Sequence, residues 1–152
     1  MANYDYSIPN YYFVTICTQN RIEYFGKIVN ERMVLNECGK LAEKFWVAMP
    51  LHYPNVALDE FVIMPNHLHG IVLLHPLVAA SGRRYSLSNI ISAYKNIAGR
   101  EMRKVNSDFS WQKSFYDNVI RKDGSLDKIR LYIRGNPLKW ELDRNNPINL
   151  WM

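Results

Sequence analysis

The sequence predicts an α+β fold in which helices pack on one face of an antiparallel β-sheet. Segments with the alternating residues of strands and segments with the helical spacing of apolar residues both occur. They follow one another in the order strand, helix, two strands, helix, strand, helix. A chain of 152 residues is long enough to bury a core of its own and too short for two independent domains. We therefore expect residues 1–152 to form a single domain.

Four segments are rich in the β-branched and aromatic residues of strands: 10–20, 55–64, 67–74 and 114–121. In the first, alternation predicts that Tyr12, Val14 and Ile16 face one side of the sheet. In the second, alternation places four residues on a common face: Val56, Leu58, Glu60 and Val62. Pro65 has no N–H to donate, so Pro65 and Asn66 should form a turn that joins the second and third strands as a hairpin.

Three segments have apolar residues at three- and four-residue spacings, as amphipathic helices do: 36–50, 87–100 and 124–136. The first is expected to stop near Pro50. The last should end at about Gly135 or Asn136, because Pro137 disfavours helical dihedral angles in the residue before it. A turn and a small hairpin are expected in 21–36. The order of all these elements is typical of ferredoxin-like and RRM-like sandwiches.

The composition gives no sign of membrane insertion or secretion. The longest apolar stretch, 71–80, is interrupted by His75 and Pro76 and is much shorter than the roughly 20 residues of a membrane helix. The N-terminal residues lack the basic and apolar regions of a signal peptide. Cys17 and Cys38 belong to no Cys-x-x-Cys pair and should be reduced thiols. We therefore expect a globular protein of the cytoplasm.

The sequence FVIMPNHLHG at 61–70 contains two candidate metal ligands. His67 and His69 are two residues apart on an expected strand, so their side chains share a face, with Cα atoms roughly 6.6 Å apart. Imidazole is the commonest metal ligand in proteins, and two such rings can converge on one cation. The alternative, from these residues alone, is a strand with two half-exposed histidines.

The sequence LYIRGNP in the last predicted helix contains a possible nucleophile and a possible third ligand. Tyr132 and Asn136 are four residues apart, so they share a helix face with Cβ atoms about 5–6 Å from each other. A phenol and an amide oxygen would then face the same site. The alternatives are a core or surface tyrosine and an asparagine that caps the helix before Pro137.

Three motifs occur in a fixed order: VIMPNHLHGIV at 62–72, WQKSFYDNVIR at 111–121 and LYIRGNPLKWELD at 131–143. Together they resemble the REP-associated tyrosine transposases and related small insertion-sequence transposases of the HUH single-strand class. The likeness runs from about Tyr11 to Trp140. His-Leu-His stands where that family has its histidine-hydrophobe-histidine motif, and Tyr-Ile-Arg-Gly-Asn-Pro resembles its tyrosine-helix motif.

The resemblance implies an HUH endonuclease fold and an enzyme that nicks and rejoins DNA. Tyr132 would attack a phosphate of single-stranded DNA, form a 5'-phosphotyrosine and release a 3'-hydroxyl. His67, His69 and Asn136 would hold Mg²⁺ or Mn²⁺. The implied partner is single-stranded DNA with hairpins from repetitive palindromic elements, in the bacterial cytoplasm and its nucleoid. Relatives include monomers and homodimers that exchange the tyrosine helix, and both states remain open here.

The chemistry of these groups agrees with the implied reaction. A divalent cation polarises a phosphate oxygen, and a phenol with a reference pKa near 10 needs deprotonation to attack. Neutral Asn136 is a poorer ligand than a carboxylate, so Asp59 or Glu60 on the preceding strand can support the metal directly or through water. Gly135 weakens the helix end beside Asn136 by roughly 0.5–1 kcal/mol relative to alanine.

The charge balance favours a polyanionic partner. Lys and Arg number 19 against 14 Asp and Glu, a formal net charge of +5 at pH 7. Nine cations are candidates for phosphate contacts, each with a solvated surface position as the alternative: Arg83, Arg84, Lys95, Arg100, Arg103, Lys104, Lys113, Arg121 and Lys122. Three aromatic residues near them are candidates for stacking on bases, with core packing as the alternative for Phe115: Tyr85, Phe115 and Tyr116.

Two other functions fit the same residues. The first is a non-catalytic module that binds DNA hairpins on this fold, in which the histidine pair is vestigial. The second is a metal-dependent phosphodiesterase that uses water in place of the tyrosine.

Overall fold

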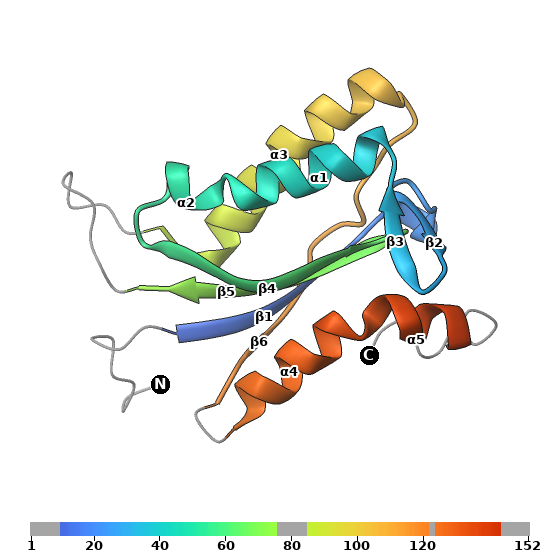
Figure 1. The fold of residues 1–152 in the computed structure, drawn as a ribbon. Helices are drawn as coiled ribbons and strands as arrows, with labels where there is room; N and C mark the ends of the chain where they lie inside the picture. Colours follow the sequence, from blue (N-terminus) through green and yellow to red (C-terminus); the bar gives the residue numbers. More distant parts are fainter. Residues whose placement is uncertain (1–9, 76–84, 122–123, 144–152) are drawn as a thin grey trace.

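A four-stranded antiparallel sheet forms the middle layer of the protein in a computed structural model, which describes residues 10–75, 85–121 and 124–143 (Figure 1). Its strands are β1 (Asn10–Cys17), β4 (Val56–Met64), β5 (His67–Leu74) and β6 (Tyr116–Val119). They lie in the spatial order β4-β5-β1-β6, and each neighbouring pair is antiparallel. This arrangement confirms the predicted α+β class and its ferredoxin-like order of elements.

Helices cover both faces of the sheet, although the sequence predicted helices on one face. The helices are α1 (Glu37–Val47), α2 (Met49–His52), α3 (Leu87–Val105), α4 (Ser125–Arg134) and α5 (Asn136–Asp143). Figure 1 shows α1 and α3 on one face and α4 and α5 on the other. The prediction failed because Ile129 and Ile133 of α4 find an apolar surface on the second face, formed by Phe13 and Ile71.

Two predicted helix ends at prolines are in fact junctions between helices. The first predicted helix begins after its N-cap Asn36 and ends as α1 at Val47, and Pro50 lies in the first turn of α2. The last predicted helix ends as α4 at Arg134, close to the expected position. However, Pro137 is the second residue of α5, where a missing N–H is tolerated. Proline suits the first turn of a helix as well as the position after one, so these two prolines begin helices instead of only ending them.

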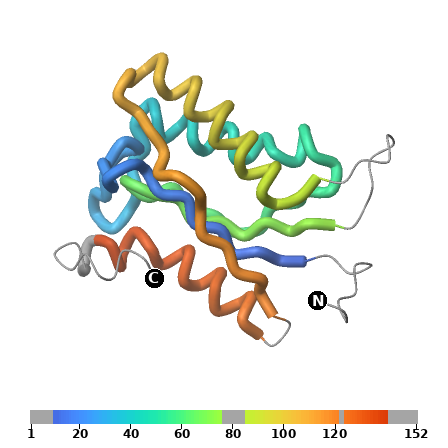
Figure 2. The backbone as a smooth tube through the Cα atoms, turned by 180° about the vertical axis from the view of Figure 1, so that it is seen from behind, coloured from blue at the N-terminus to red at the C-terminus, as the bar shows by residue number. Residues whose placement is uncertain are grey.

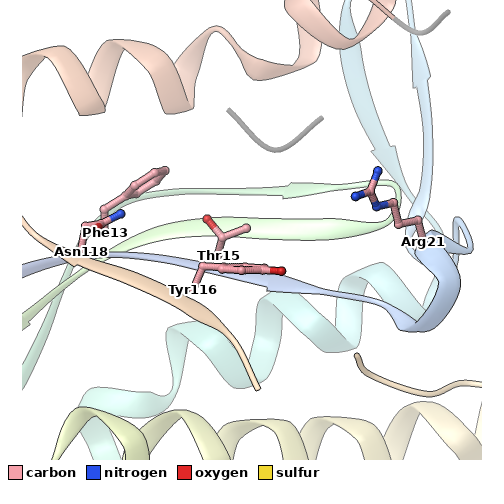
Figure 3. A pocket seen from close by; sticks show the side chains of 5 residues that line it. All are labelled: Phe13, Thr15, Arg21, Tyr116 and Asn118. Carbon is pink, nitrogen blue, oxygen red and sulfur yellow. The ribbon is translucent and has the colours of Figure 1, made fainter. Parts of the chain in front are cut away.

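The small hairpin expected in 21–36 is present as β2 (Gly26–Val29) and β3 (Arg32–Leu35). The first predicted strand is shorter than expected, because the backbone leaves the sheet after Cys17 and forms the 3-10 turn η1 (Gln19–Arg21). Asn20 and Arg21 both have φ of 54°, in the left-handed region. This turn carries the Arg21 side chain back toward the sheet (Figure 3).

Alternation predicts the faces of β1 correctly and those of β4 only in part. Three residues of β1 face α1 and α3, as expected: Tyr12, Val14 and Ile16. In β4, a β-bulge between Leu58 and Phe61 shifts the register against β5. Leu58 and Phe61 therefore both pack toward α1 and α3, whereas Val62 packs under α4. The predicted common face of Leu58 and Val62 is wrong for this reason.

The larger hydrophobic core of the described residues lies between the sheet and helices α1 and α3. Trp46 of α1 is fully buried there and packs edge-on against Tyr94, with ring centroids 5.4 Å apart. Trp46 also lies directly on the backbone of β5 at Gly70, where an added Cβ would be 2.3 Å from its Cζ2 atom. The smaller core lies under α4 and has three buried residues: Ile71, Ile120 and Ile133.

Cys17 and Cys38 are buried and unbridged, in agreement with the expectation of reduced thiols. Burial raises the pKa of the Cys17 thiol to about 11. Over the described ranges, we find no helix with both the length and the apolar character needed to span a bilayer.

Candidate active site

The two histidines lie side by side on β5, an interior strand of the sheet. His67 is paired with Cys17 of β1, and His69 with Thr15. Both side chains face α4 and α5, because the His69 ring is 5.6 Å from the Tyr132 ring and the His67 ring is 6.1 Å from that of Trp140. The two imidazole rings are 4.7 Å apart between centroids. The structure therefore brings the histidines together, but they are buried rather than half-exposed, at 4% and 1% exposure.

Hydrogen bonds orient both imidazole rings through their Nδ1 atoms. The His67 Nδ1 atom is 2.7 Å from Oδ1 of Asn66, whose Nδ2 donates to the backbone carbonyl of Arg21. Since the asparagine oxygen can only accept, the His67 Nδ1–H donates, and the lone pair is left on Nε2. The His69 Nδ1 atom is 2.8 Å from the hydroxyl of Thr15. Both rings are thus fixed as metal-ligating histidines usually are.

The Nε2 atoms of both histidines are buried and have no hydrogen-bond partner among the described residues. Buried polar atoms are nearly always paired in native proteins, so two orphans on adjacent rings need an explanation. Two neutral imidazole nitrogens are suitable ligands for a divalent cation. The donor set therefore fits the metal that the sequence resemblance implies.

Both histidines are held in the neutral form. Burial, with a smaller contribution from the charge of Arg21, lowers the pKa of His67 to about 4. Burial also lowers the pKa of His69 well below its usual range, and positive charge on His67, when that ring is protonated, and on Lys139 acts in the same direction. Neutral rings keep their lone pairs available at pH 7.

Tyr132 lies on α4 and faces the histidine pair. Its ring is half-buried and packs edge-on against Phe13, with centroids 6.1 Å apart, in addition to its contact with His69. The Nζ atom of Lys139 lies 5.1 Å from the centre of the ring. Burial raises the pKa of the Tyr132 phenol, and a hydrogen bond with the Asn136 side chain opposes this shift. The phenol is therefore protonated at neutral pH.

Asn136 is the first residue of α5 and is buried, at 6% exposure. Its Nδ2 donates to the backbone carbonyl of Tyr132, one helical turn earlier, at 2.7 Å. Of the two polar atoms in this side chain, only Oδ1 can bind a cation. Within the described ranges, no cluster of three or more His, Cys, Asp or Glu side chains is placed to bind a metal. Asn136 thus stays the predicted third ligand.

Glu60, the predicted support for the metal, is engaged with α4. Its Oε1 accepts hydrogen bonds from Nε and Nη2 of Arg134, at 3.0 and 2.8 Å. The neighbouring Asp59 accepts from Nε and Nη2 of Arg130, at 2.8 and 2.6 Å. The two carboxylates of the β4 bulge therefore tie β4 to the helix that carries Tyr132. A role of Glu60 toward the metal remains a prediction.

A pocket of about 520 Å³ opens on the same face of the sheet as the histidines (Figure 3). Its lining comes from β1, β6 and the turn after β1: Phe13, Thr15, Arg21, Tyr116 and Asn118. Two of these residues contact His69, because the Phe13 ring stacks on it at 5.2 Å and Thr15 bonds its Nδ1. The sequence interpretation proposed only Tyr116 for this surface. The alternation of β1, which points Phe13 and Thr15 away from the larger core, was the available signal.

The predicted phosphate-binding cations do not gather at this site. Three of them, Arg83, Arg84 and Lys122, lie outside the described residues. Three others are exposed on α3, on the opposite face of the sheet from α4 (Figure 1): Arg100, Arg103 and Lys104. Lys95 is half-buried and donates to the backbone carbonyls of Gln112 and Ser114, both at 2.8 Å. Lys113 and Arg121 are exposed at either end of the segment that contains β6.

Comparisons with known proteins place this chain in one family. The family model described as "Transposase IS200 like" matches residues 8–136. An uncharacterised protein of Haemophilus influenzae is 34% identical over 160 residues, which cover 95% of this chain and 89% of that protein. The family match confirms the resemblance inferred from the three sequence motifs.

Two solved structures share the fold at low sequence identity. A REP-associated tyrosine transposase bound to a REP hairpin is 18% identical, with a TM-score of 0.57, and the match covers 91% of this chain and 74% of that one. A crystal structure assigned to a transposase from Deinococcus radiodurans R1 is 14% identical, with a TM-score of 0.56, and the match covers 87% and 92%.

Proposed function

The chain belongs to the IS200-like transposase family, and on this basis we propose that it is a metal-dependent enzyme that cleaves and rejoins single-stranded DNA through Tyr132. One observation carries the proposal. The Tyr132 ring lies 5.6 Å from that of His69, beside two neutral histidines whose Nε2 atoms have no partner in the described structure. A nucleophile next to two imidazole nitrogens that can bind a metal is the arrangement that transesterification at a phosphate needs.

We assign the metal ligands to Nε2 of His67, Nε2 of His69 and Oδ1 of Asn136. A bound Mg²⁺ or Mn²⁺ would polarise a non-bridging oxygen of the scissile phosphate and balance the charge of the transition state. The hydrogen bonds of His67 with Asn66 and of His69 with Thr15 keep the two histidine rings in position. The hydrogen bond from Asn136 Nδ2 to the Tyr132 backbone carbonyl would hold the third ligand next to the residue that carries the nucleophile.

Tyr132 Oη would attack the phosphorus atom after losing its proton. The new P–O bond to tyrosine replaces the bond to the 3'-oxygen, which takes up a proton and leaves as a 3'-hydroxyl. The phosphodiester energy is retained in the tyrosine ester, so a 3'-hydroxyl can reverse the step without ATP. The Lys139 ammonium lies 5.1 Å from the centre of the Tyr132 ring, where its positive charge would favour the phenolate.

We further propose that the partner is single-stranded DNA that carries a hairpin. The net charge of +5 favours a polyanion, and one structure of the same fold is that of a transposase bound to a REP hairpin. The bound hairpin is a property of that transposase, and it supports the choice of a hairpin substrate for this chain.

The decisive experiment incubates the protein with Mn²⁺ and end-labelled single strands from a hairpin library, followed by denaturing electrophoresis. A DNA-linked protein band is expected for the parent, and its loss is expected for Tyr132→Phe, for His67→Ala and in EDTA. Tyr53→Phe and His52→Ala are the matched controls, because both residues lie on the α1 and α2 side of the sheet.

Two other outcomes would contradict the proposal. Cleavage that survives Tyr132→Phe but not His67→Ala would indicate a phosphodiesterase that uses water. Hairpin binding without any adduct, unchanged in Tyr132→Phe, would indicate a non-catalytic DNA-binding module.

A further inference from the structure

The pocket beside His69 has walls that are continuous with the candidate active site. Thr15 is 2.8 Å from His69 Nδ1, and the Phe13 ring stacks on His69 and touches Tyr132. A group bound in the pocket would therefore lie next to the phosphate that Tyr132 is proposed to attack. The proposed reaction does not use the other three lining residues, Arg21, Tyr116 and Asn118.

The pairing of β1 with β6 explains why the lining residues converge. Phe13 lies opposite Asn118, and Thr15 lies opposite Tyr116, so these four side chains project from the same face of the sheet. β6 is the edge strand of the described sheet, and its four residues are exposed. Figure 2 shows β6 running alongside β1 at the edge of the sheet.

The turn after β1 adds a cation to one end of the pocket. The Arg21 backbone carbonyl accepts from Asn66 Nδ2, and Asn66 is also the residue that orients His67. One asparagine therefore fixes both the backbone of Arg21 and the ring of a metal ligand. Figure 3 shows the Arg21 side chain on the same face of the sheet as Phe13 and Thr15.

We propose that this pocket binds one unstacked base of the DNA strand, next to the scissile phosphate, and that Asn118 selects that base. The inference rests on the proposed function. Tyr116, at 53% exposure, offers a ring on which a base can stack. The Asn118 amide can both donate to and accept from a base edge, and Arg21 can contact the adjoining phosphate. The volume of about 520 Å³ lies within the range of roughly 300–1,000 Å³ that is usual for small-ligand pockets.

A nucleotide fits this lining better than a purely apolar or a purely anionic ligand does. Phe13 and Tyr116 supply apolar surface, whereas Thr15 and Asn118 supply neutral polar groups and Arg21 a single charge. In a single strand the bases are not committed to partners and can be splayed into such a pocket. The pocket is thus a site at which side chains would recognise one base of the single strand.

The test sequences the DNA that becomes linked to the protein from a hairpin library with randomised single-stranded flanks. We expect the parent to favour certain bases at one position beside the phosphotyrosine. Asn118→Ala should retain the adduct and reduce that preference by about 5-fold or more. Tyr116→Ala should raise the KM for DNA by about 5- to 100-fold with little change in kcat. The controls are Asp117→Ala and Val119→Ala, on the same strand but the opposite face.

Two results would overturn the inference while leaving the proposed function intact. One is an unchanged base preference in Asn118→Ala, and the other is an unchanged KM in Tyr116→Ala, each with normal adduct formation by the parent. If the parent forms no adduct at all, a binding assay still decides. Tyr132→Phe protein in EDTA is titrated into single strands that carry 2-aminopurine, whose fluorescence is quenched by stacking. Quenching that Tyr116→Ala relieves supports the pocket, and equal quenching in both proteins contradicts it.

Discussion

At the scale of single residues, hydrogen bonds orient the two histidines so that both can bind a ligand through Nε2. Each ring uses Nδ1 for a neighbour in the protein and leaves Nε2 without a partner among the described residues. Leaving a buried acceptor unpaired costs of the order of 1–3 kcal/mol, so the arrangement lowers stability in the absence of a ligand. Such a cost is typical of binding sites, where the ligand supplies the missing interaction.

The burial of His67 predicts a loss of stability in mild acid. Its pKa is about 4 in the folded state and near 6.5 in the unfolded chain, so the unfolded state gains the proton first. The contribution of His67 to the free energy of unfolding is complete above pH 6.5 and is lost as the pH falls toward 4. Lowering the pH from 7 to 5 should therefore reduce the free energy of unfolding by about 2 kcal/mol.

Urea unfolding in EDTA at pH 7 and pH 5 measures this effect. His69 acts in the same direction, since its pKa is also lowered by burial. His67→Gln should show a smaller pH dependence than the parent, whereas exposed His52→Gln should retain the parent's dependence. If the free energy of unfolding falls by the same amount from pH 7 to pH 5 in the parent and in His67→Gln, then His67 is not buried in its neutral form.

At the scale of elements, the two halves of the site rest on different supports. The histidines lie on β5, which is hydrogen-bonded to β1 and β4 on its two sides. Tyr132 lies on α4, whose core contact is the small cluster around Ile71 and Ile133. The ion pairs of Arg130 with Asp59 and of Arg134 with Glu60 complete the attachment of α4. The position of Tyr132, the proposed nucleophile, therefore depends on polar contacts more than the position of the histidines does.

Removing the Arg130 side chain should impair the reaction more than the fold. Arg130 holds Asp59 with two hydrogen bonds, and this contact lowers the pKa of the Asp59 carboxyl. A loosened α4 would displace the Tyr132 phenol, and displacements of about 1 Å can reduce rates by about 100-fold. We expect a 10- to 100-fold lower kcat for adduct formation in Arg130→Ala, with little change in KM.

Graded variants separate positioning from general destabilisation. Arg130→Lys keeps the charge but not the paired hydrogen bonds, and its kcat should lie between those of the parent and the alanine variant. Arg134→Ala removes a more exposed ion pair and should change kcat by less than about 3-fold. A kcat for Arg130→Ala equal to that of the parent would contradict the positioning role.

At the scale of the whole molecule, the sequence predicted what depends on local pattern. Alternation of residues predicts the strands around Val14 and His69. The missing N–H of Pro65 predicts the hairpin turn. The bulge after Leu58 and the second face used by Ile133 depend on strand pairing, which no single segment reveals. Pro137 predicts the end of a helix, but proline is equally suited to the first turn of a helix, and here it begins α5.

The residues of the site divide in the same way. His67, His69, Tyr132 and Asn136 were named from motifs, and the structure brings Tyr132 to the histidine pair. The partner of His69 was missed, because Thr15 meets it only through the register of β1 with β5. The pocket was missed for the same reason, since it needs the further pairing of β1 with β6.

The arrangement of the whole chain predicts that one molecule provides the complete site. Tyr132 packs against the histidines of its own chain, so we expect the proposed nucleophile and the proposed metal ligands to act in cis. A mixture of His67→Ala and Tyr132→Phe proteins should therefore form no more adduct than either variant alone. Adduct formation restored by mixing would show that α4 is exchanged between two copies.

The contact between Trp46 and Gly70 also constrains how this protein can change over evolutionary time. Any side chain at residue 70 would meet the Trp46 ring at the strand position next to His69, so a substitution there would disturb a proposed metal ligand. A larger residue at 70 becomes tolerable only if residue 46 becomes smaller at the same time. The two positions should therefore covary among related chains, and glycine at 70 should accompany tryptophan at 46.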